Sequence, residues 1–162
     1  LAPDVRPAGP GWRWGFAVGA PGFAALLLAL WLAWSGAVPA PAAPGEVARV
    51  VYHINNSGTA RAALRTLSNH LNASPQLKVV VVAHNEGVDF LLQGARDESG
   101  DPFEPAVRKF RERGVEFRVC YNTLERRRIG ERQVIPAASL VPSGIAEISR
   151  LQSQEGYLYM RL

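Results

Sequence analysis

The side chain with the greatest capacity for chemistry is Cys120, the only cysteine among the 162 residues. Before it, Val115, Phe117 and Val119 alternate with charged residues, which is the pattern of a half-buried strand. A helix is expected to begin just after it, and the free amides and dipole of a helix N-terminus stabilise a thiolate. A lone thiol has no partner for an internal disulfide. Cys120 is therefore either a nucleophile or sulfur carrier, or a small packed residue.

Three further turns are expected at the same edge of the fold, each where a strand ends and a helix begins: residues 55–58, 84–87 and 142–144. Ligands of open α/β sheets bind beyond the carboxyl ends of the strands, so this edge is the predicted site. His84 either relays a proton for Cys120 or is a hydrogen-bonded structural residue. The other candidates, predicted to bind an anion or substrate, are Asn55, Ser57, Gly58, Gly87, Asn122, Thr123, Ser143 and Gly144.

Two neighbouring features have both a functional and a structural interpretation. The polar run at residues 55–59 either holds an anion at a helix N-terminus or simply caps the helix. Arg126, Arg127, Arg128 and Arg132 either attract an anionic sulfur species or an acidic partner, or form a solvated helix end. The sequence leaves both choices open.

Composition and motifs exclude several classes of function. The formal net charge is only +4, so bulk nucleic-acid binding is not expected. The sequence has no GxGxxG motif and no P-loop, which argues against a nucleotide cofactor, and it has no GxSxG elbow. One cysteine and three scattered histidines give no zinc-ligand spacing. We therefore predict no cofactor and no metal.

Strand and helix patterns alternate after residue 46, which is typical of an α/β fold with a mainly parallel sheet. Strands are predicted over residues 47–54, 77–83, 115–119 and 157–162, with an extended segment at 138–141. Helices are predicted over residues 60–73, 88–95, 103–113, 121–128 and 142–152. The expected architecture has three layers and a sheet of about five strands. One N-terminal transmembrane or signal helix is expected to precede it.

Residues 1–45 differ sharply in composition from residues 46–162, the predicted globular domain. No charged residue lies between Trp14 and Val38, a stretch long enough to cross a bilayer as a helix. Prolines follow it and its apolar run is long for a cleaved signal, which favours an inner-membrane signal anchor with the domain in the periplasm. The alternatives are a cleaved signal peptide, which would release the domain into the periplasm, and a buried soluble helix.

Several blocks of the sequence resemble the DsrE/DsrF-like family. They are VVYHINNSGTARAALRTLSNHLNASPQLKVVVVAHNEGVDFLLQGA, GVEFRVCYNTL and LVPSGIAEISRLQSQEGYLYMRL, and they cover nearly all of residues 47–162. The resemblance implies a compact α/β fold, often assembled as trimers or hexamers. It also implies that Cys120, at the family's cysteine position, accepts and passes sulfane sulfur as a persulfide. One departure is Asn85, which stands where the family usually has a glycine after the histidine.

Two hypotheses of function follow. The first is a membrane-tethered DsrE-like domain that carries sulfur on Cys120, exchanging it with a donor and an acceptor protein that the sequence does not name. The second is a non-catalytic accessory or binding subunit that forms a homo-oligomer or joins a membrane complex. The accessibility of Cys120 in the folded protein distinguishes the two.

Overall fold

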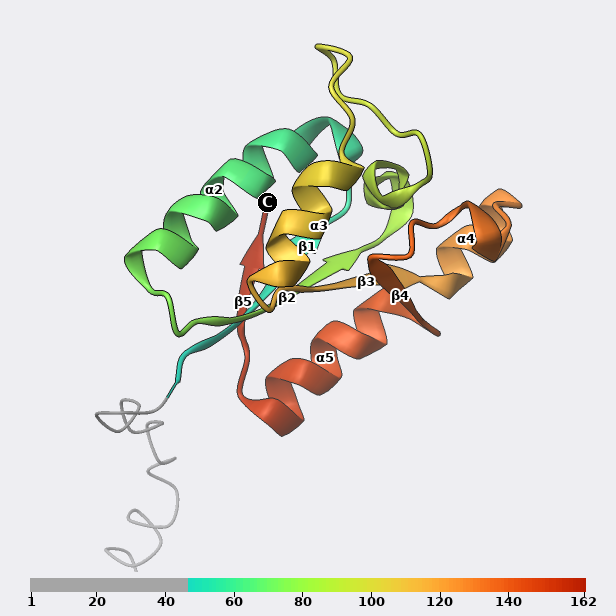
Figure 1. Ribbon diagram of the computed structural model, residues 1–162. Helices are drawn as coiled ribbons and strands as arrows, with labels where there is room; N and C mark the ends of the chain where they lie inside the picture. The colour runs from blue at the N-terminus through green and yellow to red at the C-terminus, as the bar shows by residue number, and fades with distance from the viewer. Residues whose placement is uncertain (1–46) are drawn as a thin grey trace, which may run out of the picture. The chain divides into compact units, whose positions relative to one another are not determined.

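The computed structural model describes residues 47–162, and the predicted membrane or signal helix of residues 1–45 lies outside them. The described chain alternates strands and helices along its length (Figure 1). The strands are β1 (Arg49–Ile54), β2 (Lys78–Ala83), β3 (Glu116–Cys120), β4 (Ala138–Val141) and β5 (Leu158–Arg161). The α-helices are α2 (Ala60–Ala73), α3 (Glu104–Glu112), α4 (Tyr121–Arg127) and α5 (Gly144–Glu155). Three 3₁₀ segments, η1 (Ser57–Thr59), η2 (Asn85–Leu91) and η3 (Glu131–Gln133), complete the set.

The five strands form one sheet in the order β4-β3-β2-β1-β5, and every pairing is parallel. Helices α2 and α3 cover one face of this sheet and α5 covers the other (Figure 1). The predicted three-layer α/β class with a parallel sheet is confirmed. Because all strands run the same way, their carboxyl ends lie along one edge of the sheet.

Successive side chains along each strand point to opposite faces of the sheet, so the strands contribute to two separate hydrophobic cores. The larger one lies under α2 and α3 and contains Tyr52, Val81 and Phe117. The smaller one lies under α5 and contains Val51, Val80 and Val82, with further members Ile148, Leu151 and Tyr157. Strands that are buried on both faces read as continuous apolar runs, and this is why residues 79–83 carry no polar side chain.

The predicted helix over residues 88–95 is wrong in both type and limits. The structure has the 3₁₀ segment η2 there, and it begins earlier, at Asn85, and ends at Leu91. Its buried residues are Gly87, Val88, Phe90 and Leu91. They pair at a spacing of three, which suits a 3₁₀ segment better than an α-helix.

Among residues 47–162, no helix combines the length and the hydropathy that crossing a bilayer requires.

A chain of charged side chains fixes α5 to the sheet. Arg118 of β3 bonds Glu147 of α5, and Arg150 bonds Glu147 at 2.8 Å and Glu155 at 2.6 Å. The hydrogen bond from Arg150, with the charges of both arginines, lowers the pKa of Glu147. Glu147 is therefore ionised at neutral pH and holds the first turns of α5 above β3. That placement sets the position of residue 144, the first of the helix.

Candidate functional site

The predicted turns do meet at the carboxyl edge of the sheet. Cys120 is the last residue of β3, and His84 directly follows β2. The β2–β3 register pairs Ala83 with Val119, so continued by one residue it sets His84 beside Cys120. Alternation along the strands turns both side chains toward the face that α5 covers. The edge predicted from sequence thus brings together the thiol and an imidazole.

Gly144 at the N-terminus of α5 lies directly over this pair. A Cβ atom added at Gly144 would stand 3.1 Å from the Cys120 Cβ and 3.5 Å from the His84 Cβ. It would also stand 3.3 Å from Val82 Cγ1. The Cys120 side chain and backbone together are only 3% exposed. A glycine at this position lets the helix end approach closely enough to cover the thiol.

The first residues of α4 after Cys120 make hydrogen bonds to neighbouring turns. Cys120 occupies the N-cap position of α4 but its side chain makes no capping hydrogen bond. The Asn122 amide donates to the Pro142 carbonyl at 3.1 Å. The Thr123 hydroxyl is buried and accepts a hydrogen bond from the Asn85 amide at 3.2 Å. These groups connect neighbouring turns, and the Asn122 amide is already bonded to the Pro142 carbonyl.

A second histidine, His53 of β1, joins the site on the same face. It is 7% exposed, and its Nδ1 shares a hydrogen bond of 2.9 Å with the Tyr159 hydroxyl of β5. The rings of His53 and His84 lie 5.8 Å apart between centroids. Within residues 47–162, neither His53 Nε2 nor His84 Nδ1 has a hydrogen-bond partner, although both atoms are buried. Such buried ring nitrogens are sites at which a ligand atom gains most from a hydrogen bond.

Both imidazoles are electrostatically biased toward the neutral form. Burial lowers the pKa of His53, and the charges of His84 and Arg161 lower it further. Burial also lowers the pKa of His84, with a further contribution from Arg126. Neutral imidazoles accept protons at pH 7, so His84 is suited to take a proton from a neighbouring thiol.

Gly87 and Asn85 give the 84–87 turn its shape. A Cβ atom at Gly87 would lie 2.1 Å from the Ile54 carbonyl oxygen, so only glycine fits there. Asn85 adopts φ +53°, the left-handed conformation that glycine adopts most easily. Arg126 donates to the Asn85 side-chain oxygen at 2.6 Å and Arg127 donates to the Asn85 carbonyl at 3.1 Å. Asn85 therefore adopts a conformation that glycine would favour, and Gly87 makes the close backbone approach.

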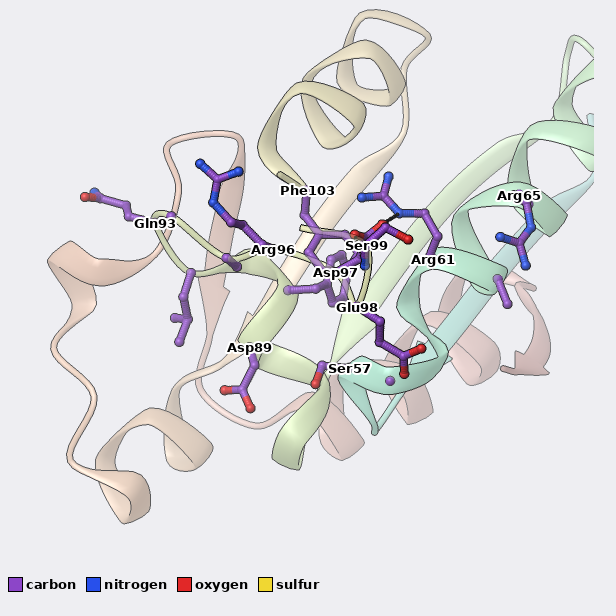
Figure 2. A pocket seen from close by; sticks show the side chains of 16 residues that line it. Ser57, Arg61, Arg65, Asp89, Gln93, Arg96, Asp97, Glu98, Ser99 and Phe103 are labelled. Atoms are coloured by element: carbon purple, nitrogen blue, oxygen red, sulfur yellow. Dashed lines mark hydrogen bonds and ion pairs between the residues drawn. The ribbon is translucent and has the colours of Figure 1, made fainter. Parts of the chain in front are cut away.

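The capping side chains are Asn56 for η1 and Ser143 for α5. The Gly58 amide donates to the Asn56 side chain at 2.8 Å, and the Ser143 hydroxyl accepts from the Ala146 amide at 3.4 Å. Ser57 and Gly58 line a cavity of about 660 Å³ beside α2, which Figure 2 shows from close by. That cavity does not include Cys120 or His84 among its lining residues.

The cavity beside α2 is bounded by a loop that Arg61 of α2 holds in place. Arg61 bonds Asp97 at 2.6 Å and its guanidinium lies 4.7 Å from the centre of the Phe103 ring (Figure 2). Arg61 also donates to the Asp101 carbonyl at 3.1 Å. The Asp97 carboxylate in turn accepts the amides of Ser99 and Asp101. These contacts explain the arginine and the aspartates there as loop anchors.

Asn55 lies in a different cavity, at the rim itself, which also contains Asn85, Arg126 and Arg161. The sequence pointed to Asn55 and Arg126 but missed Arg161, Tyr159 and His53 as members of the site. Only the pairing of β5 with β1 brings Arg161 beside His53. Strand alternation does place His53 on the face of Asn55, so this one signal was present in the sequence. Among the described residues, no cluster of histidine, cysteine and carboxylate side chains could hold a metal ion.

Comparisons with known proteins place this architecture in a family. Residues 48–162 match the DsrE/DsrF-like family. The protein of unknown function MTH1491 from Methanobacterium thermoautotrophicum is similar over 71% of this chain and 99% of its own, at 26% identity and a TM-score of 0.63. The ychN protein from E. coli matches over 72% and 100%, at 13% identity and a TM-score of 0.61, a likeness of fold alone. A search of curated proteins found no relative. The chain belongs to the DsrE/DsrF-like family.

Proposed function

We propose that this domain carries sulfane sulfur as a persulfide on Cys120, with His84 as the proton acceptor. The observation that carries the proposal is that Cys120 and His84 lie side by side under Gly144. A Cβ atom added at Gly144 would stand within 3.5 Å of the Cβ atoms of both residues. Membership in a family linked to sulfur relay supports it. A simple packed cysteine would not require a neutral imidazole on the same face of the neighbouring strand.

The transfer step balances without an added oxidant. The thiol proton passes to His84, and the Cys120 thiolate attacks a sulfur atom of a polysulfide dianion. One S–S bond forms on Cys120 and one S–S bond of the polysulfide breaks. The electron pair of the broken bond leaves with the shortened polysulfide dianion, which then takes the proton from His84. An acceptor thiolate later removes the outer sulfur by the same exchange.

The N-terminus of α5 supports the charged forms of the sulfur. The first amides of a helix have no intrahelical partner. In α5, Ser143 takes up the Ala146 amide, which leaves the amides of Gly144 and Ile145 for a thiolate or persulfide. Because Cys120 is 3% exposed, we expect the turn at residues 142–144 to move aside before a donor reaches the sulfur.

Mass spectrometry of the intact protein after polysulfide treatment tests the proposal. We expect the wild type to gain the mass of one or more sulfur atoms, on the peptide that contains Cys120. Cys120→Ser is expected to gain none, because serine cannot form a persulfide. A folded wild type that gains no more sulfur than Cys120→Ser would overturn the proposed function.

The exposed strand β5 favours a second candidate function, an oligomerising accessory or binding subunit. β5 ends the sheet, and its side chains are exposed although apolar: 64% for Leu158, 42% for Tyr159 and 40% for Met160. Apolar edge strands are ready to pair with another chain. We propose that β5 forms a contact in a homo-oligomer, such as a trimer or hexamer, or in a membrane complex. The anchor expected from residues 14–38 would hold such an assembly at the membrane.

The molar mass from light scattering, measured on the domain of residues 47–162, tests whether β5 forms a contact between copies. The wild type is expected to be oligomeric, and Leu158→Glu is expected to shift it toward the monomer, because a charge buried in an apolar contact is costly. Ile145→Glu, on the exposed side of α5, is the matched control and is expected to leave the mass unchanged. A monomeric wild type at high concentration would contradict the β5 interface.

A further inference from the structure

A basic cavity lies at the carboxyl edge of the sheet, between the ends of β1, β2 and β5 and helix α4. Its volume is about 540 Å³. We call it the arginine cavity, and it is lined by Asn55, Asn56, Asn85, Glu86, Arg126, Arg127 and Arg161. Only one of its lining residues is acidic. The proposed sulfur-transfer step uses none of them.

The three arginines of the arginine cavity differ in how many contacts their side chains make within the protein. Arg127 pairs with Asp89 at 2.8 Å, so its charge is largely satisfied. Arg126 donates to the neutral Asn85 side chain and makes no ion pair with another described residue. Arg161 makes neither an ion pair nor a side-chain hydrogen bond within residues 47–162. Arg126 and Arg161 come from different elements and converge on one hollow with their charge available.

The charges of the two uncommitted arginines reach the histidines of the candidate site. The charge of Arg161 contributes to the lowered pKa of His53, and that of Arg126 to the lowered pKa of His84. His53 is more than nine-tenths buried and keeps an unpartnered Nε2. The guanidinium groups of Arg126 and Arg161 line the cavity and are donors that a small anion can accept from.

We propose that the arginine cavity binds a small dianion, with Arg126 and Arg161 supplying the charge. The identity of the natural ligand rests on the proposed function: it is a short polysulfide dianion, which binds in the cavity before its sulfur passes to Cys120. His84 lies between the cavity and the thiol. The charge of Arg126 contributes to its lowered pKa, and its Cβ atom lies beside Gly144 as the Cys120 Cβ does. An anionic donor would thus be concentrated within reach of a thiol that is itself covered.

Sulfate is the probe for binding, because it carries two charges and cannot transfer sulfur to a thiol. Titration followed by NMR should show saturable shifts of the amides at the rim, Asn55 and Asn85 among them. Arg161→Gln and Arg126→Gln are each expected to weaken binding about tenfold, since each removes a charge-assisted contact. Arg128→Gln, which removes the same charge from the C-cap of α4 but not from the cavity, should change affinity by less than about twofold.

The outcomes separate the anion site from the sulfur carrier. Cys120→Ser should bind sulfate as the wild type does, because its thiol is not a cavity residue. Sulfate should slow polysulfide loading of the wild type, and Arg161→Gln should load about tenfold more slowly at low polysulfide. No saturable shifts, or an equal loss in Arg128→Gln, would overturn the anion site. Sulfate binding without any loading of Cys120 would keep the anion site and overturn the sulfur carrier.

Discussion

Replacing Gly87 with alanine is expected to lower the free energy of unfolding by at least about 4 kcal/mol, enough to unfold much of the domain. The added Cβ would lie 2.1 Å from the Ile54 oxygen, 2.6 Å from the Ile54 carbonyl carbon and 2.9 Å from the Asn55 Cα. All three are backbone atoms at the end of a central strand. They cannot rotate away as a flexible side chain can.

Relief of this clash would break the contacts that define the rim. The Ile54 carbonyl accepts the His84 amide at 3.0 Å, and the His84 carbonyl accepts the Gly87 amide at 2.9 Å. Moving Ile54 away from residue 87 would strain the first of these bonds and shift His84. We therefore expect Gly87→Ala to lose the site even where some fold persists.

Urea unfolding followed by circular dichroism measures the effect of Gly87→Ala. Gly130→Ala is the matched control, because its added Cβ would meet nothing closer than 3.7 Å and its φ of −70° suits any residue. The control is expected to cost less than about 1 kcal/mol. An unfolding midpoint for Gly87→Ala close to that of Gly130→Ala would show that the turn is not held as the structure describes.

Local patterns predicted most of the secondary structure, because strong periodicity and clear breakers marked it. The helix at 60–73 has the predicted limits, with Ala63, Leu64, Leu67 and Leu71 on its buried face. The strand before Cys120 and the helix after it also lie where alternation and its loss indicated. The strand-to-helix junction that singled out Cys120 is thus a property of neighbouring residues alone.

What the sequence could not predict depends on which segments meet in space. The order of strands sets β5 beside β1, and this pairing alone brings Tyr159 and Arg161 to His53. The Asn122 amide looked free because its partner, the Pro142 carbonyl, comes from a turn that is distant in sequence. His70 of α2 bonds through its Nδ1 to the hydroxyl of Tyr52 in β1 at 2.7 Å, a partner that helical spacing does not indicate. Each of these contacts joins segments that are distant in sequence, so the local pattern of residues does not predict it.

Replacing His84 with glutamine is expected to slow polysulfide loading of Cys120 about a hundredfold, the low end of what a positioned proton acceptor contributes. Glutamine has a similar reach and can accept a hydrogen bond, but it cannot take the thiol proton at neutral pH. His70→Gln is the matched control, because His70 contacts Tyr52 on the opposite face of the sheet. Circular dichroism of both variants checks that each remains folded.

The pH dependence distinguishes a proton acceptor from a residue that only packs against Cys120. Loading should rise with pH as His84 loses its proton, and burial together with Arg126 places that rise below the ordinary histidine pKa of 6.5. Arg126→Gln removes one cause of the lowered pKa, so the rise should move upward in pH. His84→Gln should lose this rise altogether. A His84→Gln protein that loads slowly but keeps the wild-type pH profile would assign His84 a packing role, and the thiol proton would then leave by another group.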